Sequence, residues 1–172
     1  MNSLKKIKEW LNTFTSFNEQ EQVDCQYIRQ FLEEEPNLLL RDNVKMHFTA
    51  SAWVLNPSKD KVLMLYHNIY QSWSWSGGHA DGEGDLLSVA MKEVKEESGL
   101  VSLKPLSDSP ISIEILGVQP HYKKQKYVSA HLHLNYTFLL HNTKEEKLKI
   151  LSKQLDAEEK GKILEVSTGI NG

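Results

Sequence analysis

The N-terminal part of the chain carries apolar side chains at the spacing of amphipathic helices. Leu4, Ile7, Trp10, Leu11 and Phe14 recur every three or four positions and therefore fall on one face of a helix. The basic residues beside this face would allow the helix to lie on a membrane surface. We expect it instead to pack against its own domain.

A second helix is predicted to begin after residue 18. Asn18 and Glu21 have the spacing of a capping box, and Pro36 ends the helix or lies just beyond its end. The apolar face of this helix would consist of Val23, Tyr27, Ile28, Phe31 and Leu32. Residues 1–44 are therefore predicted to form a helical N-terminal extension.

From residue 45 the hydrophobic pattern changes to the two-residue period of β-strands. In residues 46–56 apolar and more polar side chains alternate up to Asn56-Pro57, which closes the strand. The pattern predicts further strands at 61–67, 111–119 and 128–141, a helix at about 85–98, and a weak last strand in KILEVS. We therefore expect an α/β layered domain over residues 45–172.

Composition and charge narrow the class of protein. The chain is 40% hydrophobic and 25% charged, as in one soluble globular domain, and its net charge of -3 gives no electrostatic reason to bind a nucleic-acid polymer. No apolar run reaches the roughly 20 residues of a membrane span. The start of the chain lacks the apolar core and cleavage site of a signal peptide, so we expect a cytoplasmic location. Cys25, the single cysteine, excludes an internal disulfide and is expected to be a packing residue.

Residues 77–100, GGHADGEGDLLSVAMKEVKEESGL, carry the strongest chemical signal. Glu93, Glu96 and Glu97 stand at i, i+3 and i+4 and so project from one stripe of the predicted helix, where like charges cost about 0.2–0.5 kcal/mol per pair. A solvated acidic face is one interpretation. Gly77 and Gly78 before the helix favour another, in which a tight turn gathers oxygen ligands for a hard cation such as Mg²⁺.

This stretch resembles the Nudix box, Gly-x5-Glu-x7-Arg-Glu-hydrophobe-x-Glu-Glu-x-Gly-hydrophobe, with the same spacing from Gly78 to Leu100. The resemblance covers about residues 45–141 as a fold and is sharpest over residues 77–100; it implies a Nudix-like α/β/α sandwich with a mixed β-sheet. It also implies hydrolysis of a nucleoside diphosphate linked to another group.

Two positions of the box depart from the family pattern. Gly84 stands where the first glutamate is expected, with Glu83 one residue earlier. Lys92 replaces the arginine; it can still neutralise Glu93, but it lacks the bidentate fork of a guanidinium.

The resemblance assigns catalysis to Glu93, Glu96, Glu97 and Lys92, and metal binding to the three glutamates with the backbone carbonyl of Gly77. One to three Mg²⁺ ions, or Mn²⁺, would neutralise the diphosphate, polarise a phosphoryl oxygen and lower the pKa of the attacking water. The proton acceptor would be a box glutamate or a later acidic residue, with these candidates: Glu145, Glu146, Asp156, Glu158 and Glu159.

Histidines are the candidates for substrate contact. His79 directly follows the glycine turn and could approach a phosphate or cap the turn. His131, His133, Asn135 and Thr137 alternate with apolar residues, so they share a polar strand face that either lines a cleft or is exposed. A zinc site at His131 and His133 is not favoured, because the sequence shows no third ligand at a fitting spacing.

Two aromatic or basic stretches allow a structural and a functional interpretation. Trp73 and Trp75 could stack on a base, but we expect core positions for them. Lys123, Lys124 and Lys126 lie in a predicted loop that could attract a phosphorylated substrate or simply be solvated.

The sequence therefore predicts a pyrophosphohydrolase whose partner is a small nucleoside diphosphate derivative. ADP-ribose, nucleoside triphosphates, dinucleotides and nucleotide sugars all contain the diphosphate that the box would bind. The alternative is a Nudix-fold nucleotide-binding or regulatory module with little turnover, which Gly84 and the atypical C-terminal end would allow. A Nudix-fold isomerase is disfavoured because Cys25 lies outside the part of the chain expected to supply a catalytic cysteine.

Overall fold

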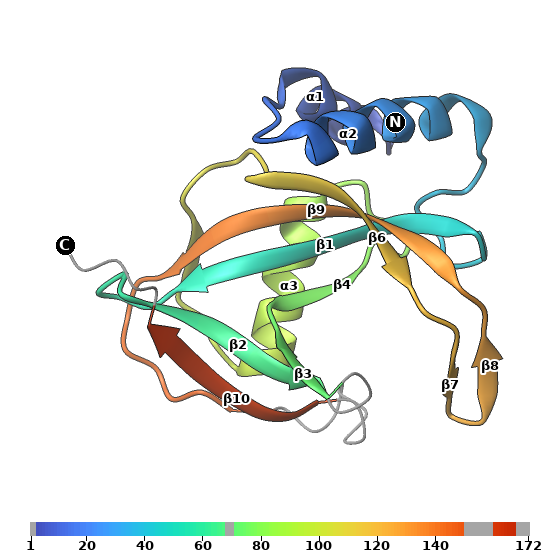
Figure 1. Ribbon diagram of the computed structural model, residues 1–172. Helices are drawn as coiled ribbons and strands as arrows, with labels where there is room; N and C mark the ends of the chain where they lie inside the picture. The colour runs from blue at the N-terminus through green and yellow to red at the C-terminus, as the bar shows by residue number, and fades with distance from the viewer. Residues whose placement is uncertain (1–2, 68–70, 150–159, 168–172) are drawn as a thin grey trace.

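A computed structural model describes residues 3–67, 71–149 and 160–167 of the chain (Figure 1). The helices are α1 (Lys5–Thr13), α2 (Glu19–Glu34) and α3 (Leu86–Ser98). The strands are β1 (Met46–Leu55), β2 (Lys61–His67), β3 (Ser72–Ser74), β4 (Ser76–His79), β5 (Leu103–Pro105), β6 (Ser112–Val118), β7 (His121–Lys123), β8 (Lys126–Val128), β9 (His131–Asn142) and β10 (Lys160–Ser167).

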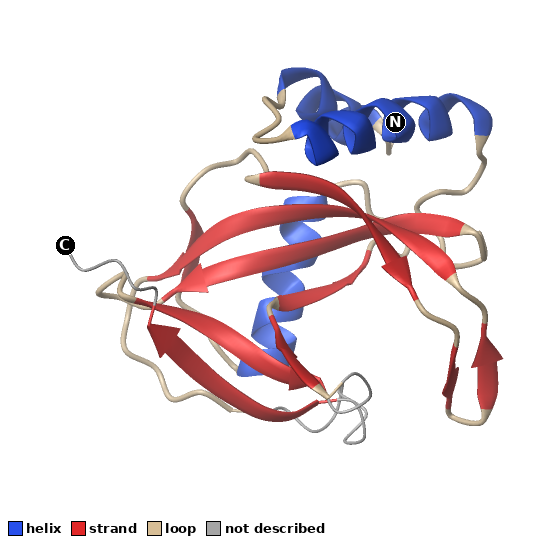
Figure 2. Cartoon of the chain, in the orientation of Figure 1, coloured by secondary structure: helices blue, strands red, loops and turns tan. Residues whose placement is uncertain are grey.

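Eight of the described strands form one mixed, curled sheet with helices packed against it, and a helical N-terminal extension precedes it, as predicted; β7 and β8 form a separate two-stranded sheet (Figures 1 and 2). The main path through the sheet is β10-β2-β1-β9-β5, with β3 beside β2, β4 beside β1 and β6 beside β9. Strands β1 and β9 run parallel along their whole contact, from Met46 opposite Leu132 to Leu55 opposite His141. The other pairs are antiparallel. Because β4 also pairs with β1, the glycine turn of the box lies beside the centre of the sheet.

One face of the central strands is apolar and forms the core. Phe48, Ala50 and Ala52 of β1 lie on this face with Tyr136 and Phe138 of β9, and all five are fully buried. Each large side chain buried in this way stabilises the fold by about 1.5–3 kcal/mol.

Helix α1 packs on this apolar face, which confirms that its hydrophobic stripe serves its own domain. The ring of Trp10 meets that of Phe138 edge-on at a centroid distance of 5.2 Å. Ile7 and Leu11 of the same helix are buried. Among the described residues no helix is both long and apolar enough to cross a lipid bilayer.

Helix α2 begins with the predicted cap and buries part of the predicted face. The Asn18 side chain accepts a hydrogen bond from the Glu21 N–H at 2.9 Å. Of the residues predicted for the apolar face, Ile28 is buried and Phe31 and Leu32 are partly buried against the core. Val23 and Tyr27 are 42% and 51% exposed, so the prediction was wrong for these two. The buried face also carries Glu21, Asp24 and Cys25, which were not predicted for it.

The reason is the free edge of strand β6. The Asp24 carboxylate accepts the Ile115 N–H at 2.9 Å, and Ser112 donates its hydroxyl to Glu21. The helix therefore closes the sheet edge with carboxylates rather than with apolar side chains. Cys25 is buried beside them, and its burial raises the pKa of the thiol, in keeping with the expected packing role.

Two further local predictions are corrected by the structure. The basic stretch expected as a loop is the hairpin β7–β8, which turns at Lys124 and Gln125 with φ angles of 47° and 63°. Trp73 is 39% exposed and lies against Tyr66, so it is not a core residue.

The weak last strand is present as β10 and pairs with β2. Asp156, Glu158 and Glu159 lie outside the described residues.

Candidate active site

Helix α3 is set in place by both of its ends and by its apolar side. Asp85 caps the N-terminus by accepting the Ser88 N–H at 3.3 Å. Gly99 ends the helix in the left-handed region at φ 76°, where glycine has no steric penalty. Ala90 and Val94 are fully buried against the sheet. The three glutamates predicted for the site therefore lie on a rigid element that packs beside β4 and β1.

Glu97 is the most buried of the three, at 3% exposure. Its Oε2 accepts a hydrogen bond from the hydroxyl of Ser76 on β4 at 2.9 Å. Ser76 is buried as well, so this bond fixes the carboxylate relative to the strand that leads into the glycine turn. A hydrogen bond to a charged group contributes about 1.5–3 kcal/mol.

Glu93 lies directly against the first glycine of the box. A Cβ added at Gly78 would overlap the Glu93 side chain, including its carboxylate. Only a residue without a side chain leaves room for that carboxylate at the strand backbone. The position of the Glu93 side chain therefore explains why residue 78 is a glycine in this chain.

Lys92 forms an ion pair with Glu96, not the expected one with Glu93. Its ammonium lies 3.8 Å from Glu96 Oε1, one helical turn away. The Lys92 side chain is 69% exposed, so the pair contributes no more than about 0.3–0.5 kcal/mol.

The departure at Gly84 has a structural cause that the sequence did not reveal. A Cβ at this position would overlap the backbone carbonyl of Ser3, just before α1. The neighbouring contact between Lys6 and Asp85, at 2.7 Å, joins α1 to the cap of α3. The N-terminal extension therefore occupies the space in which a glutamate side chain at position 84 would begin.

The carboxylates on α3 are ligands of the kind that a hard divalent cation prefers. Glu93 and Glu97 lie against β4, and Glu96 projects from the same stripe of the helix; among the described residues, the ligand atoms of these three glutamates are not gathered within 4.8 Å of one another. Hard cations such as Mg²⁺ prefer oxygen ligands and keep several of their waters. Gly77, whose carbonyl was predicted as a further ligand, lies on β4 opposite Ser51.

The opposite face of β1 and β9 is polar, as the alternation on β9 predicted. Asn135 bonds to Thr49 and Ser51, and Ser51 lies 2.9 Å from Thr137. All four side chains are buried, so this part of the polar face is an internal hydrogen-bonded network rather than an exposed surface.

At one end of the polar face four imidazoles come together. His79, His131 and His133 were candidate site residues, and the structure adds His47 from the start of β1. Burial lowers the pKa of His79 to about 3, with the charges of Arg41 and Lys123 acting in the same direction. Burial and the neighbouring imidazoles likewise lower the pKa of His133 to about 3. These two rings are therefore neutral near pH 7.

Sequence reasoning missed His47 because the parallel pairing of β1 with β9 brings it opposite His133. Burial lowers the pKa of His47 too, and the Asn43 carbonyl acts in the other direction. The only available signal was that His47 begins the alternating polar series His47, Thr49, Ser51.

Of the acidic residues proposed as proton acceptors, Glu146 has a structural role. Its carboxylate accepts the N–H groups of Val101 and Ser102 at 3.3 and 3.1 Å. Burial raises its pKa, but these hydrogen bonds outweigh that effect and lower the pKa of Glu146 below its usual value. Glu145 is exposed beside it.

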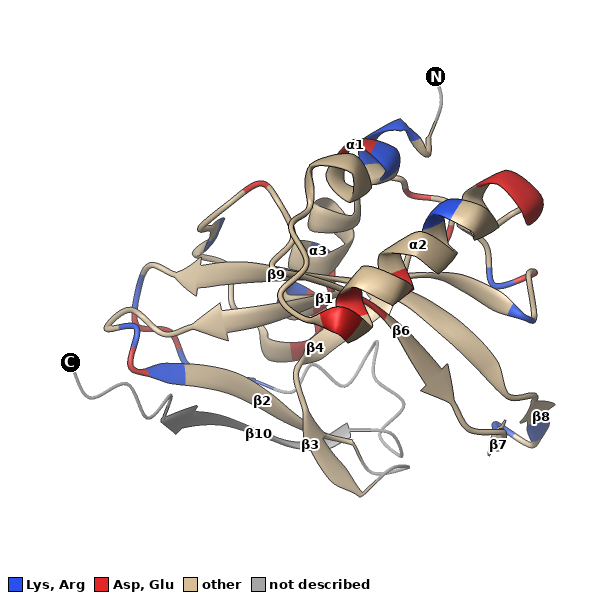
Figure 3. Cartoon of the chain, turned by 45° about the horizontal axis from the view of Figure 1, so that its top comes forward, with Lys and Arg blue, Asp and Glu red and all other residues tan. Residues whose placement is uncertain are grey.

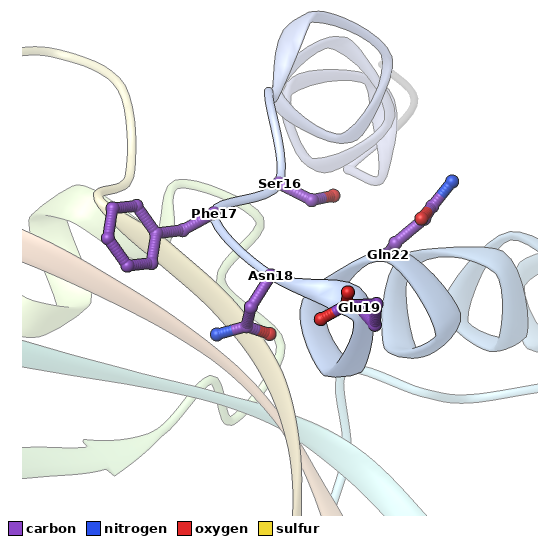
Figure 4. Close-up of a pocket in the computed structure, with 5 residues that line it drawn as sticks. All are labelled: Ser16, Phe17, Asn18, Glu19 and Gln22. Carbon is purple, nitrogen blue, oxygen red and sulfur yellow. The ribbon is translucent and has the colours of Figure 1, made fainter.

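Neither the surface pockets nor the distribution of charged residues indicates an active site away from α3. One hollow at the α1–α2 turn is lined by Ser16, Phe17, Asn18, Glu19 and Gln22 (Figure 4). Phe17 points away from Glu19 and Gln22 and is 92% exposed, so this hollow is a shallow surface feature. A second hollow lies on α3 itself, beside Lys92 and Glu96. Figure 3 shows acidic residues at the two ends of α2 and basic residues on α1 and hairpin β7–β8, while β1 and β9 carry little charge.

Comparison with known proteins identifies the family. Residues 45–165, most of the chain, match the family model described as NUDIX domain. The chain therefore belongs to the NUDIX family and is a pyrophosphohydrolase of that class.

Solved structures of low identity are similar to the chain. A C. elegans Ap4A hydrolase is 17% identical, with 70% of this chain and 79% of that chain covered and a TM-score of 0.49. A NUDIX-family hydrolase from Clostridium perfringens is 19% identical, with coverages of 70% and 80% and a TM-score of 0.48. The E. coli dihydroneopterin triphosphate pyrophosphohydrolase is 16% identical, with coverages of 70% and 80% and a TM-score of 0.48. No curated protein sequence matches the chain.

Proposed function

We propose that the protein hydrolyses the pyrophosphate bond of a nucleoside diphosphate linked to another group, and that the reaction requires Mg²⁺ or Mn²⁺. The observation that supports this proposal best is the packing of two carboxylates against β4. Glu93 fills the space beside Gly78, and the Ser76 hydroxyl holds Glu97. Carboxylates one turn apart on a helix repel one another, and a divalent cation would remove that repulsion.

In the proposed site Glu93, Glu96, Glu97 and the Gly77 carbonyl hold the metal. When bound, the metal supplies charge neutralisation for the diphosphate and lowers the pKa of the attacking water. Ser76 keeps the Glu97 carboxylate oriented, and Lys92 places a positive charge beside Glu96.

Contact of His79, His131 and His133 with the substrate stays a prediction, and so does a cytoplasmic location. Since the hydrogen bonds to Glu146 tie it to the loop after α3, we favour a box glutamate as the proton acceptor.

The first experiment is a hydrolysis screen. Purified protein with Mg²⁺ or Mn²⁺ is offered ADP-ribose, nucleoside triphosphates, dinucleotides and nucleotide sugars, and phosphate is measured after coupling to a phosphatase. We expect turnover of one compound class and a loss of about 10–100-fold or more in Glu97→Gln. Glu34→Gln, an exposed position on α2, is the control and should retain the wild-type rate.

Gly78→Ala tests the geometry without removing a ligand. Its methyl group would displace the Glu93 carboxylate, so kcat should fall while the fold is retained, because the end of a glutamate side chain can change its rotamer and move aside. Metal-dependent nucleotide binding with no turnover of any compound would instead identify a binding module.

A further inference from the structure

The four histidines at the end of the polar face form a cluster that is separate from the metal site proposed on α3. Their rings come from three strands: His47 from β1, His79 from β4, and His131 and His133 from β9. Among the described residues, one ligand atom each of His47, His79 and His133 lies within 4.8 Å of the other two. The fourth ring is adjacent, since His131 Nε2 lies 3.1 Å from His133 Nε2.

We propose that this cluster binds a borderline divalent transition-metal ion of the Zn²⁺ class, with His47, His79 and His133 as ligands and His131 as the fourth. The proposal does not depend on the hydrolytic activity, because the four histidines lie on the side of the sheet opposite to the carboxylates of α3.

Backbone carbonyls fix the protonation of two of the rings. His47 Nδ1 lies 3.1 Å from the Asn43 carbonyl, and His131 Nδ1 lies 2.8 Å from the Ser129 carbonyl. A carbonyl can only accept a hydrogen bond, so each Nδ1 carries the proton and each Nε2 presents a lone pair. A metal-binding histidine is usually oriented in this way, by a hydrogen bond from its other ring nitrogen.

The Nε2 of His47 provides the second observation. This atom is buried and has no hydrogen-bond partner. Buried polar atoms without a partner are rare in folded proteins and call for an explanation such as an ion. A metal ion bound among the rings would accept this lone pair.

The distances suit a small tetrahedral site. Zinc binds imidazole nitrogens at about 2.0–2.1 Å, which places neighbouring ligand atoms about 3.3–3.4 Å apart. The separation of 3.1 Å between His131 and His133 is close to that value. A set of ligand atoms already within 4.8 Å needs only small side-chain movements to close around one ion.

Donor chemistry separates this site from the one on α3. Imidazoles favour Zn²⁺, Cu²⁺, Ni²⁺ and Co²⁺, whereas Mg²⁺ prefers oxygen ligands. A tetrahedral site closed by four protein ligands is structural rather than catalytic. The ion would tie β4 to β1 and β9 at the residue next to Gly78.

The test is calorimetric titration of the full chain with Zn²⁺, with any purification tag removed and with Mg²⁺ present at saturation. We expect about one Zn²⁺ per chain. His47→Gln and His133→Gln should each weaken binding by no less than the roughly 10–100-fold that follows loss of an outer-shell partner. Two controls should bind as the wild type does: His141→Gln, at the far end of β9 and bonded to the Pro57 carbonyl, and Glu97→Gln on α3.

X-ray absorption of the Zn²⁺-loaded wild-type protein decides the question if the variants fail to fold. Nitrogen-only coordination at about 2.0–2.1 Å supports the proposal. The proposal is overturned if no Zn²⁺ binds in the presence of Mg²⁺, if His141→Gln weakens binding as much as His133→Gln, or if the ion has mainly oxygen ligands.

Discussion

Gly84→Ala is the substitution that most directly tests the link between the N-terminal extension and the box. The added methyl group would overlap the Ser3 carbonyl, which belongs to the backbone and cannot rotate away as a side chain would. The segment before α1 must therefore shift, and the Lys6–Asp85 contact at 2.7 Å shifts with it. Overpacking of this kind costs about 1–3 kcal/mol.

The assay is thermal unfolding, compared with Gly117→Ala on β6. No heavy atom lies within 4 Å of a Cβ at Gly117, so this control should change the free energy of unfolding by less than about 0.5 kcal/mol. For a chain of this size each kcal/mol lowers Tm by about 2–4 °C. Hydrogen exchange should also become faster in residues 3–13 of the Gly84→Ala protein, and not in the control.

Gly84→Glu restores the family pattern and sharpens the test. Because the side chain would begin in space that Ser3 occupies, we expect lower stability and no gain in kcat. Equal Tm values for Gly84→Ala and Gly117→Ala, with unchanged exchange in residues 3–13, would refute the reasoning. So would a Gly84→Glu protein that is more active and equally stable.

Three further predictions concern buried polar groups. Ser76→Ala removes an outer-shell partner of Glu97 and should lower activity about 10–100-fold, measured as kcat/KM with the substrate found in the screen. Asp24→Ala leaves an N–H of β6 without a partner and should cost about 1–3 kcal/mol in urea unfolding. His79 and His133 have pKa values of about 3 in the folded protein and about 6.5 when unfolded, so the unfolded chain takes up their protons first. Stability should be constant above pH 6.5 and fall by up to about 1.4 kcal/mol per pH unit and imidazole below it.

Each of these predictions has a matched comparison. Activity of Ser76→Ala that equals the wild-type value would show that the hydroxyl does not orient the carboxylate. Glu33→Ala, exposed on the same helix as Asp24, should leave stability within about 0.5 kcal/mol. His133→Gln should flatten the decline in stability between pH 6 and pH 5, where most carboxylates are still charged; an unchanged slope would contradict the assigned pKa values.

Elements with local signals could be predicted from the sequence. Helix α3 was found within a residue of its ends, because Asp85 and Gly99 are terminal signals that act within a few residues. Strand β1 was found because apolar and polar side chains alternate from Met46 to Ala52. The mixed sheet followed from the family resemblance, since the hydrophobic pattern alone does not show which strands are parallel.

The predictions that were wrong concern residues whose burial or available space is set by a partner far away in the sequence. Hydropathy places aspartate on the solvent side of a helix, but Asp24 is buried because the unpaired edge of β6 offers it a backbone N–H. In the same way, the sequence alone indicates at Gly84 only the loss of the family's glutamate. The structure shows that the Ser3 carbonyl occupies the space that a side chain at position 84 would need. The proximity of His47 to His131 and His133 could not be predicted from spacing either, because the pairing of β1 with β9 brings these residues together.

Strand β4 connects the two donor sets. Gly78 faces the carboxylates of α3, and the next residue, His79, faces the imidazoles, because successive residues of a strand point to opposite sides. An ion among the imidazoles would hold β4 in place, and the position of β4 sets the room left for Glu93. If Zn²⁺ changes the affinity of the α3 site for Mg²⁺, then Mg²⁺ must change the affinity for Zn²⁺ by the same factor. Titrations with each ion in the presence and absence of the other would therefore show whether β4 couples the two faces, and an apparent affinity that keeps falling in proportion to the concentration of the other ion would mean instead that the two ions compete for one site.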